Sequence, residues 1–306
     1  MSDSPLLADL VLSRSATDRS AELRKDSEWI ARAFNDSTTL FICVNGSRAP
    51  ITGNDIAFIA FADIPRDSLT YFLGLDGGTA FFGVSVDADF VATHDSDAWL
   101  NLRASGSRLS DRDAGLLVTA VALDNWNATH PHCSRCGALT EPSDAGWARR
   151  CPVDNSTHFP RTDPAVIVLV TDSRDRVLLA RQHSWQAGWV SILAGFVEAG
   201  EPAEAAVVRE VGEETGIRID PQSIDYLGSQ PWPFPNSLML GYHARALNTD
   251  ICVDGDEIVE AGWYDRVDIK ELCGAQELHL PPRVSIAHQL LVRWFGEALP
   301  GNSSFR

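Results

Sequence analysis

The chain has 306 residues, of which 44% are hydrophobic, and its formal net charge is −17 at pH 7. This length and composition suit two or three domains with true hydrophobic cores and exclude a disordered or fibrous protein. Indiscriminate nucleic-acid binding relies on a basic surface, and a chain this acidic is therefore unsuited to it. A site for anionic phosphates in this chain would therefore need a metal ion or focused arginines.

The sequence shows no membrane or export signal. The longest apolar run, Leu116 to Leu123, is about half of the roughly 18 residues that a membrane-spanning helix needs. The N-terminus does not match a signal peptide, because Asp3 precedes its apolar stretch, Asp9 interrupts it and no basic region is present. The six cysteines stand at irregular positions, unlike a secreted disulfide framework. We expect a cytoplasmic protein without membrane association.

Residues 1–127 are predicted to form a mixed α/β domain. Apolar and β-branched runs between turn residues predict four strands: Leu40–Val44, Ile56–Phe61, Thr70–Leu75 and Phe81–Val86. A helix is predicted from Asp113 to Trp126, where apolar residues recur at helical spacing. We identify no catalytic constellation in this part of the sequence.

Residues 128–159 form a short module with cysteines at metal-ligand spacing. Cys133-Ser-Arg-Cys136 is a tight knuckle and Cys151 follows, but Asp154 stands where a complete four-cysteine zinc pattern has its last cysteine. Two readings remain open. Either Zn²⁺ is bound structurally and a fourth ligand completes the set, or the metal has been lost and the ribbon persists through packing around Trp147. The candidates for the fourth ligand are Asp154, His158, His130 and His132.

Residues 160–306 alternate predicted strands with a few helices, which predicts an α/β/α or α+β layered domain. The expected strands are Ala165–Val170, Val177–Ala180, β structure within Trp189–Val197, Ser237–Ala246 and Gly262–Asp265. A last helix is expected over Ile286–Glu297.

A second helix in this region carries clustered carboxylates. Pro202 suits the first helical position and Gly216 suits a left-handed C-cap. Glu210, Glu213 and Glu214 then stand at positions i, i+3 and i+4, on one face of the helix. Like charges at this spacing repel, so the cluster is either a solvated acidic face or a site for a hard divalent cation.

The wider pattern decides between these two readings. Gly195, Glu201, Arg209-Glu210, Glu213-Glu214 and Gly216 reproduce the Nudix box without a departure. The chain therefore resembles the Nudix hydrolases, which implies an α/β/α sandwich whose box helix binds metal against a diphosphate.

By this resemblance the box residues have definite roles. The expected ligands of Mg²⁺ or Mn²⁺ are Glu210, Glu213, Glu214 and the carbonyl of Ala194. Arg209 would hold the carboxylates in place, and Glu201 would brace the loop. Bound cations would neutralise the diphosphate, polarise its P–O bonds and activate water, so the implied reaction is hydrolysis.

A second motif follows the box. It reads Gln230-Pro231-Trp232-Pro233-Phe234-Pro235-Asn236-Ser237. Alternating prolines stiffen the backbone, so Trp232 and Phe234 become rigid flat surfaces suited to stacking on bases. The alternative is a proline-rich loop whose aromatic rings only pack.

The motif narrows the resemblance. Ser229–Ser237, with Phe159–Pro164 before the first strand and Asp256–Tyr264 after the box, is similar to the NADH pyrophosphatase (NudC) subfamily. This resemblance implies NADH and NAD⁺ as substrates, cleaved to NMN(H) and AMP, activity on NAD-capped RNA 5′ ends, and a homodimer. The implied substrate contacts are Gln230 to Ser237, Phe159, Phe196, the backbone of Ala287, and Arg103; Glu257 would be a further metal ligand or the general base.

Two other functions were weighed against hydrolysis of the free dinucleotide. The acidity of the chain favours free dinucleotide or short 5′ ends over long RNA as the main target. A Nudix-fold sensor that binds nucleotide without hydrolysis usually has a damaged box, whereas Glu210, Glu213 and Glu214 are all intact.

Overall fold

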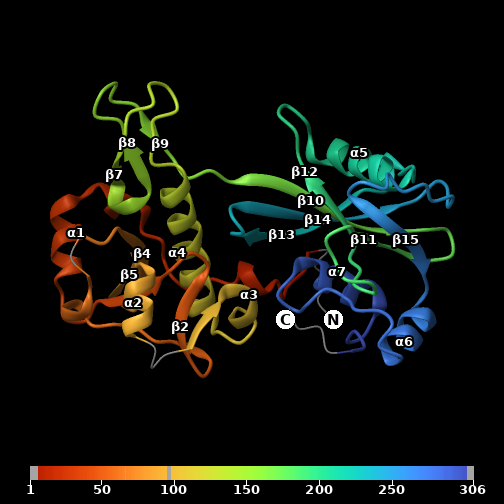
Figure 1. Cartoon of the computed structure of the whole chain (residues 1–306), viewed down its shortest axis with the longest axis horizontal. Coiled ribbons are helices and arrows are strands. Elements are labelled where there is room, and N and C mark those ends of the chain that lie inside the picture. Colours follow the sequence, from red (N-terminus) through yellow and green to blue (C-terminus); the bar gives the residue numbers. More distant parts are fainter. Residues whose placement is uncertain (1–5, 66, 95–97, 302–306) are drawn as a thin grey trace. The chain divides into compact units, whose positions relative to one another are not determined.

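The computed structural model describes residues 6–65, 67–94 and 98–301 (Figure 1). The chain divides into two compact units. The C-terminal unit contains Met1–Val11, Asp163–Gln230 and Ser237–Arg306; the N-terminal unit contains Leu12–Thr162 and Pro231–Asn236. No helix among the described residues combines the length and apolar character needed to cross a membrane.

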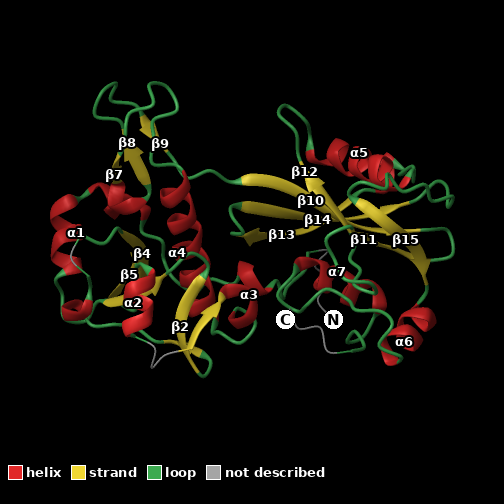
Figure 2. Ribbon diagram, in the orientation of Figure 1, coloured by secondary structure: helices red, strands yellow, loops and turns green. Residues whose placement is uncertain are grey.

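The C-terminal unit is built around a mixed six-stranded sheet (Figure 2). Its path is β13-β14-β10-β11-β15, with β12 paired to β10. The strands are β10 (Asp163–Thr171), β11 (Val177–Gln182), β12 (Leu193–Phe196), β13 (Asp225–Trp232), β14 (Ser237–Arg245) and β15 (Ile258–Tyr264). β10 runs parallel to β14 and antiparallel to β11 and β12.

Helices cover both faces of this sheet: α5 (Ala203–Thr215), α6 (Arg266–Gly274) and α7 (Ile286–Phe295). Successive side chains of a strand point to opposite faces. On β10, Val166 and Val168 pack into the core that contains Val207 of α5, whereas Ile167 enters the core that contains Leu290 of α7. The predicted α/β/α sandwich is therefore confirmed, with α5 on one face and α6 and α7 on the other (Figure 1).

Several predicted boundaries in this unit need correction. Pro202 lies before α5 rather than in its first turn, because its ψ of 147° is extended. Gly216 is the left-handed C-cap as predicted, with φ 69°. The last helix ends at Phe295, short of Glu297, because Gly296 has φ 87° and ends it. The β structure expected over residues 189–197 forms a named strand only in β12.

The N-terminal unit is also mixed α/β. It contains strands β1 (Leu40–Val44), β2 (Arg48–Thr52), β3 (Asp55–Ile56), β4 (Thr70–Asp76), β5 (Thr79–Ser85) and β6 (Ala98–Asn101). Its helices are α1 (Ser27–Phe34), α2 (Ala88–Thr93), α3 (Leu102–Ser105) and α4 (Asp111–Thr129). The strands form two sheets, β1-β5-β4 and β3-β2-β6. Phe41, Phe72 and Phe82 are fully buried or nearly so and form an aromatic core against α1.

Two sequence predictions in this unit are corrected. The strand expected over residues 56–61 is limited to β3, and Phe61–Asp63 is a short 3₁₀ helix instead. The helix expected from Asp113 begins at Asp111, because the Ser110 side chain accepts a hydrogen bond from the Asp113 amide and caps it.

The cysteine module is a small three-stranded sheet within the N-terminal unit. Its strands are β7 (Glu141–Ser143), β8 (Ala148–Arg150) and β9 (Thr157–His158), in the order β7-β8-β9. Arg149 on β8 is buried and donates to the side chains of Asn127 on α4, at 2.9 Å, and Thr140, at 2.8 Å. Because a buried guanidinium must be hydrogen-bonded, these contacts fix the module to the end of α4.

Candidate active site and metal centres

The three box carboxylates on α5 differ sharply in exposure. The side chain of Glu213 is 64% exposed and that of Glu210 is 14% exposed. Glu214 is buried, at 4% exposure. The acidic face is therefore not simply a solvated surface, since two of its three carboxylates are turned away from water.

Arg209 holds this acidic face together. Its guanidinium donates two hydrogen bonds to Glu201, both of 2.8 Å, and one of 2.9 Å to the carbonyl of Phe196. The same group contacts Glu210 at 2.9 Å and Glu213 at 3.1 Å. A planar guanidinium with several N–H donors is suited to binding several carboxylates at once. The bracing roles expected of Arg209 and Glu201 agree with these contacts.

Glu214 is the most perturbed acid of the site. Burial, followed by the charges of Glu257, Glu210 and Asp254, raises its pKa to about 8. Its Oε2 atom is buried and has no hydrogen-bond partner within the described part of the protein. A buried carboxylate oxygen without a partner is costly, and a divalent cation is the partner that would remove both the repulsion and the missing contact. The residues therefore fit the metal that the box implies.

Glycine at position 195 makes room for the carboxylate cluster. Gly195 lies in β12, paired with Val166 of β10. A Cβ atom added at this position would overlap the carboxyl group of Glu210. Ala194, whose carbonyl is an expected ligand, is the preceding residue of the same strand. The strand thus approaches the helix closely enough for backbone and carboxylate groups to share one site.

Glu257 immediately precedes β15 and interacts electrostatically with the box carboxylates. It is exposed, and its charge raises the pKa values of both Glu210 and Glu214. Its backbone amide donates to Asp254 at 3.3 Å, and Gln182 contacts its Oε1 atom at 3.4 Å. Glu257 therefore lies close enough to Glu210 and Glu214 to interact with them electrostatically.

Sequence reasoning missed Asp254. Its side chain accepts hydrogen bonds from the amides of Glu257 and Ile258, and its own amide donates to the carbonyl of Glu214 at 3.3 Å. It therefore connects the box helix to the loop that carries Glu257. The Asp-Gly pair at residues 254–255 is a turn signal that could have indicated such a role.

The proline-aromatic motif lies at the tip of the β13–β14 hairpin. Trp232 and Phe234 make an edge-to-face contact, with ring centroids 5.0 Å apart. The guanidinium of Arg103 lies 4.3 Å from the Phe234 centroid and 5.2 Å from that of Trp232. The structure thus brings Arg103 to the aromatic pair of the motif, two substrate contacts that were predicted from distant parts of the sequence.

Other predicted substrate residues are placed differently. Gln230 is fully buried and donates to the carbonyl of Val284 at 3.0 Å. Val284 precedes the start of α7, where Ala287 is buried and its amide donates to Ser285. Phe196, in the C-terminal unit, and Phe159, in the N-terminal unit, are both well exposed. Their rings are available for ligand contact, whereas the side chain of Gln230 holds the base of the hairpin.

The cysteine module gathers four potential ligands at one point. One ligand atom from each of Cys133, Cys136, Cys151 and Asp154 lies within 4.8 Å of the others. The Sγ atoms of Cys136 and Cys151 are 3.5 Å apart, and Cys133 Sγ is 3.6 Å from Asp154 Oδ2. Tetrahedral Zn²⁺ with bonds of about 2.0–2.3 Å separates neighbouring ligands by roughly 3.5–3.8 Å. The Cys136–Cys151 and Cys133–Asp154 distances therefore fit zinc.

Ser156 orients the unusual fourth ligand. Its amide and hydroxyl both donate to Oδ1 of Asp154, at 2.9 and 2.5 Å, which leaves Oδ2 towards the thiols. His158 contacts the Ser156 hydroxyl instead of joining the cluster. Hydrogen bonding to Ser156 also lowers the pKa of Cys133 to about 6 and that of Asp154 below its ordinary range. Of the alternatives for the fourth position, the geometry selects Asp154.

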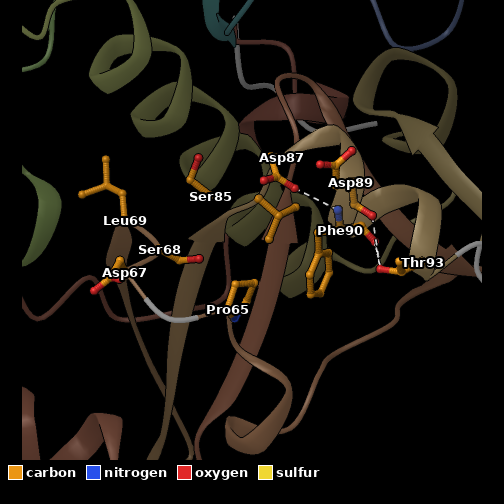
Figure 3. A pocket seen from close by; sticks show the side chains of 10 residues that line it. Pro65, Asp67, Ser68, Leu69, Ser85, Asp87, Asp89, Phe90 and Thr93 are labelled. Atoms are coloured by element: carbon orange, nitrogen blue, oxygen red, sulfur yellow. Dashed lines mark hydrogen bonds between the residues drawn. The ribbon is translucent and has the colours of Figure 1, made fainter.

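A pocket of about 580 Å³ opens beside α2 in the N-terminal unit (Figure 3). Asp67, Asp87 and Asp89 line it. Asp87 accepts a hydrogen bond from the amide of Phe90 and caps α2, and the hydroxyl of Thr93 donates to the Asp89 carbonyl. None of the sequence-predicted site residues lines this pocket, so it is separate from the metal and substrate residues described above.

Comparison with family models gives three consecutive matches. The NUDIX domain matches residues 161–288, the NADH pyrophosphatase zinc ribbon domain matches residues 128–159, and the NADH pyrophosphatase-like rudimentary NUDIX domain matches residues 10–126. The three matches account for both the box helix and the cysteine module.

Relatives match along nearly the whole chain. The NAD-capped RNA hydrolase NudC of Mycobacterium bovis is 36% identical over 93% of this chain and 94% of its own length. The human NAD-capped RNA hydrolase NUDT12 is 30% identical over 92% of this chain and 72% of its own. A crystal structure of a NUDIX hydrolase from Nitrosomonas europaea matches with TM-score 0.44 and 20% identity, over 56% of this chain and 95% of that one. By its relatives and its three domain matches, this chain belongs to the NudC family of Nudix hydrolases.

Proposed function

We propose that this enzyme hydrolyses the diphosphate of NADH and NAD⁺, releasing NMN(H) and AMP. The observation that carries the proposal is the cluster of Glu210, Glu214 and Glu257 around an unpartnered buried carboxylate oxygen. An intact acidic cluster supports hydrolysis over a sensor that only binds. The aromatic hairpin and the NudC relatives support a nicotinamide dinucleotide as the substrate.

The catalytic roles follow from the arrangement of the acids. Glu210, Glu213, Glu214 and Glu257, with the carbonyl of Ala194, would hold Mg²⁺ or Mn²⁺, and Arg209 keeps the carboxylates in place. The bound cation would supply charge neutralisation of the diphosphate and activation of water. Water adds across the phosphoanhydride: a new P–O bond forms, the bridging P–O bond breaks, and the bridging oxygen leaves with the other phosphate. Exposed Glu257 would serve either as a further metal ligand or as the general base that takes the proton of the attacking water.

We assign substrate recognition to groups outside the box. Trp232 and Phe234 present flat surfaces that would stack on the nicotinamide base, and Phe159 and Phe196, whose rings are exposed, would each be a further contact of the nicotinamide. Arg103 contributes positive charge beside the aromatic pair. Ala287 would contact the substrate through its backbone. The remaining motif residues shape the hairpin: Gln230, Pro231, Pro233, Pro235, Asn236 and Ser237.

NAD-capped RNA 5′ ends are a second substrate class. The observation that favours them is the activity named for the relatives from M. bovis and human. The net charge of −17 favours free dinucleotide or a short 5′ end over long RNA, because RNA binding gains from released counterions only on a basic surface.

One experiment tests the proposed function directly. The protein is incubated with NADH, NAD⁺, ADP-ribose, diadenosine diphosphate and NAD-capped RNA under Mg²⁺ and under Mn²⁺, and kcat/KM is compared. We expect NMN(H) and AMP from NADH with the highest kcat/KM among the free dinucleotides. Preference for ADP-ribose or diadenosine diphosphate would contradict the assignment of substrate. Binding of NADH without cleavage under either metal would favour the sensor.

We also propose that the cysteine module binds structural Zn²⁺ through Cys133, Cys136, Cys151 and Asp154. The ligand distances support this, as does the family zinc ribbon match at residues 128–159. Zinc content by plasma emission spectroscopy is expected to be one ion per chain after dialysis. Zinc-free protein with unchanged thermal stability would support persistence of the ribbon by packing alone.

The organisation of the protein completes the proposal. We divide the chain into an N-terminal domain of residues 1–127, a ribbon module of residues 128–159 and a Nudix domain of residues 160–306. We further propose a homodimer, supported by large exposed apolar side chains on the ribbon, Leu139, Val153 and Phe159. The six free cysteines suit a reducing compartment, so we place the enzyme in the cytoplasm. Light scattering of the purified protein tests the dimer.

A further inference from the structure

The tip of the β13–β14 hairpin, Pro231–Asn236, belongs to the N-terminal unit, although the two strands belong largely to the C-terminal sheet. The tip clusters with residues 12–162 of that unit. The boundary falls directly after Gln230, whose side chain is anchored to Val284 of the C-terminal unit. The motif therefore has two differently supported parts, a base and a tip.

The tip depends on outside donors because of its composition. Proline has no N–H group, so Pro231, Pro233 and Pro235 remove every second backbone donor from the tip. Within it, the Phe234 amide donates to the carbonyl of Trp232 at 2.7 Å. The carbonyls of Pro233 and Pro235 are satisfied from elsewhere, and partly buried carbonyls need such partners.

Asn125 on α4 supplies those donors. Its side-chain amide donates to the Pro233 carbonyl at 2.9 Å and to the Pro235 carbonyl at 3.1 Å. An asparagine amide carries two N–H bonds, so both are used on the two sides of Phe234. One side chain of the N-terminal unit thus fixes the backbone on both sides of an aromatic residue of the motif.

Arg103 completes the support from the same unit. It lies on α3, where its amide donates to the Asn101 side chain at 2.8 Å, and its guanidinium lies over Phe234 and Trp232. A cation over an aromatic face restrains the ring. Asn125 therefore holds the backbone of the tip, and Arg103 holds the rings.

We propose that Asn125 is a positioning residue for substrate selection: through its two hydrogen bonds, the rudimentary N-terminal unit sets the orientation of Trp232 and Phe234 and hence the preference for nicotinamide dinucleotides. This inference rests on the proposed function. It assigns to the N-terminal unit a part in specificity without placing any of its residues at the diphosphate. Asn125 acts through the aromatic pair, so its loss should affect substrate binding and not the chemical step.

The test compares Asn125→Asp and Asn125→Ala with the wild type. Aspartate keeps the shape but donates no hydrogen bond and repels the two carbonyls, whereas alanine removes the side chain. Both variants are expected to raise KM for NADH by about tenfold, with kcat within about twofold and KM for ADP-ribose unchanged. Asn125→Gln, which keeps the amide, should recover part of the loss. Equal effects on both substrates, or a loss in kcat alone, would overturn the proposal.

Hydrogen exchange of the hairpin provides a readout that needs no substrate. The peptide containing residues 231–236 should exchange faster in Asn125→Asp, while the box helix exchanges as in the wild type. Asn35→Ala is the matched control, since the side chain of Asn35, the residue after α1, also donates to a backbone carbonyl, that of Ala31 at 2.7 Å. An unchanged hairpin in Asn125→Asp would refute the positioning role, whereas a wild-type enzyme inactive on NADH would refute the proposed function.

Discussion

The acidic cluster on α5 and the cysteine cluster of the ribbon are both suited to cations, but they are built on opposite principles. In the acidic cluster, like charges are forced together, and Arg209 and burial resist their separation. In the ribbon, four ligand atoms of a softer set lie within 4.8 Å of one another, and Ser156 orients the one carboxylate.

This difference separates a working site from a structural one. The acidic cluster keeps an exposed carboxylate, Glu213, and an unpartnered oxygen on Glu214, so it has coordination capacity to share with a diphosphate. Four protein ligands in the ribbon would fill the tetrahedral positions of zinc and leave none for a substrate. The acidic cluster is thus electrostatically strained and open to substrate, whereas the zinc site of the ribbon would be closed to it.

The largest effect should come from Glu214. Glu214→Gln removes the charge of the buried carboxylate that we propose to bind the metal, while keeping its size, so kcat for NADH should fall by about a thousandfold or more. The measurement is steady-state hydrolysis under saturating Mg²⁺ or Mn²⁺, with circular dichroism to check folding. Near-normal turnover would contradict the comparison between the two clusters, because the acidic cluster would then have no catalytic role that the ribbon lacks.

The metal-free stability of the same variant measures the strain. The folded-state pKa of Glu214 is about 8, above the ordinary value of 4.5, so the folded state binds this proton more tightly. Stability from this group is present below pH 4.5 and lost as the pH rises to about 8, by roughly 2–4 kcal/mol. In EDTA, Glu214→Gln should be the more stable protein at pH 8 and should lack this decline. Parallel urea-unfolding curves for both proteins across this range would show that no strain is stored.

Substitution of a ribbon ligand should lower the stability of the protein, in contrast to Glu214→Gln, which should relieve repulsion. Cys151→Ser removes a buried thiol of the cluster, so zinc content should fall and the free energy of unfolding should drop by about 2–3 kcal/mol. Zinc content and urea unfolding are measured on the same preparation. A variant that keeps the zinc and stability of the wild type would remove Cys151 from the ligand set.

The smallest effect should come from restoring a fourth cysteine. Asp154→Cys replaces a hard oxygen by a thiolate, which zinc binds more strongly, so the affinity for Zn²⁺ should rise by about tenfold. Competition with a chromogenic chelator measures the change. Lower affinity in the variant would indicate that the Ser156-oriented carboxylate is better matched to this ribbon than a thiolate is.

Sequence reasoning was accurate where a local pattern determines the structure. The box helix was predicted from Pro202 to Gly216, and the C-cap was right because only a residue tolerant of positive φ suits it. The start was wrong by one residue, because Pro202 has an extended ψ of 147° and is the N-cap, so the first helical residue is Ala203. The strand pair β10 and β11 followed from continuous apolar runs that only a sheet covered on both faces can bury.

The missed features depend on partners that are distant in the sequence. Asn125 looks like an ordinary polar position on α4 until the carbonyls of Pro233 and Pro235 are beside it. The bonds of Arg149 to Asn127 and Thr140 likewise cross the fold. Helix α6 lies in a stretch with few periodic apolar residues, although its capping box, Asp265 with Asp268, was a readable start signal.

Two glycines between residues 195 and 201, Gly195 and Gly200, show how differently one residue type can be constrained. Gly200 has φ +84° with open space around it, so asparagine or aspartate should survive there at reduced fitness. Gly195 has no such backbone demand, yet any side chain would enter the space of the Glu210 carboxylate. In a saturation library selected for activity, several residue types should therefore be recovered at position 200, whereas only glycine should be recovered at position 195.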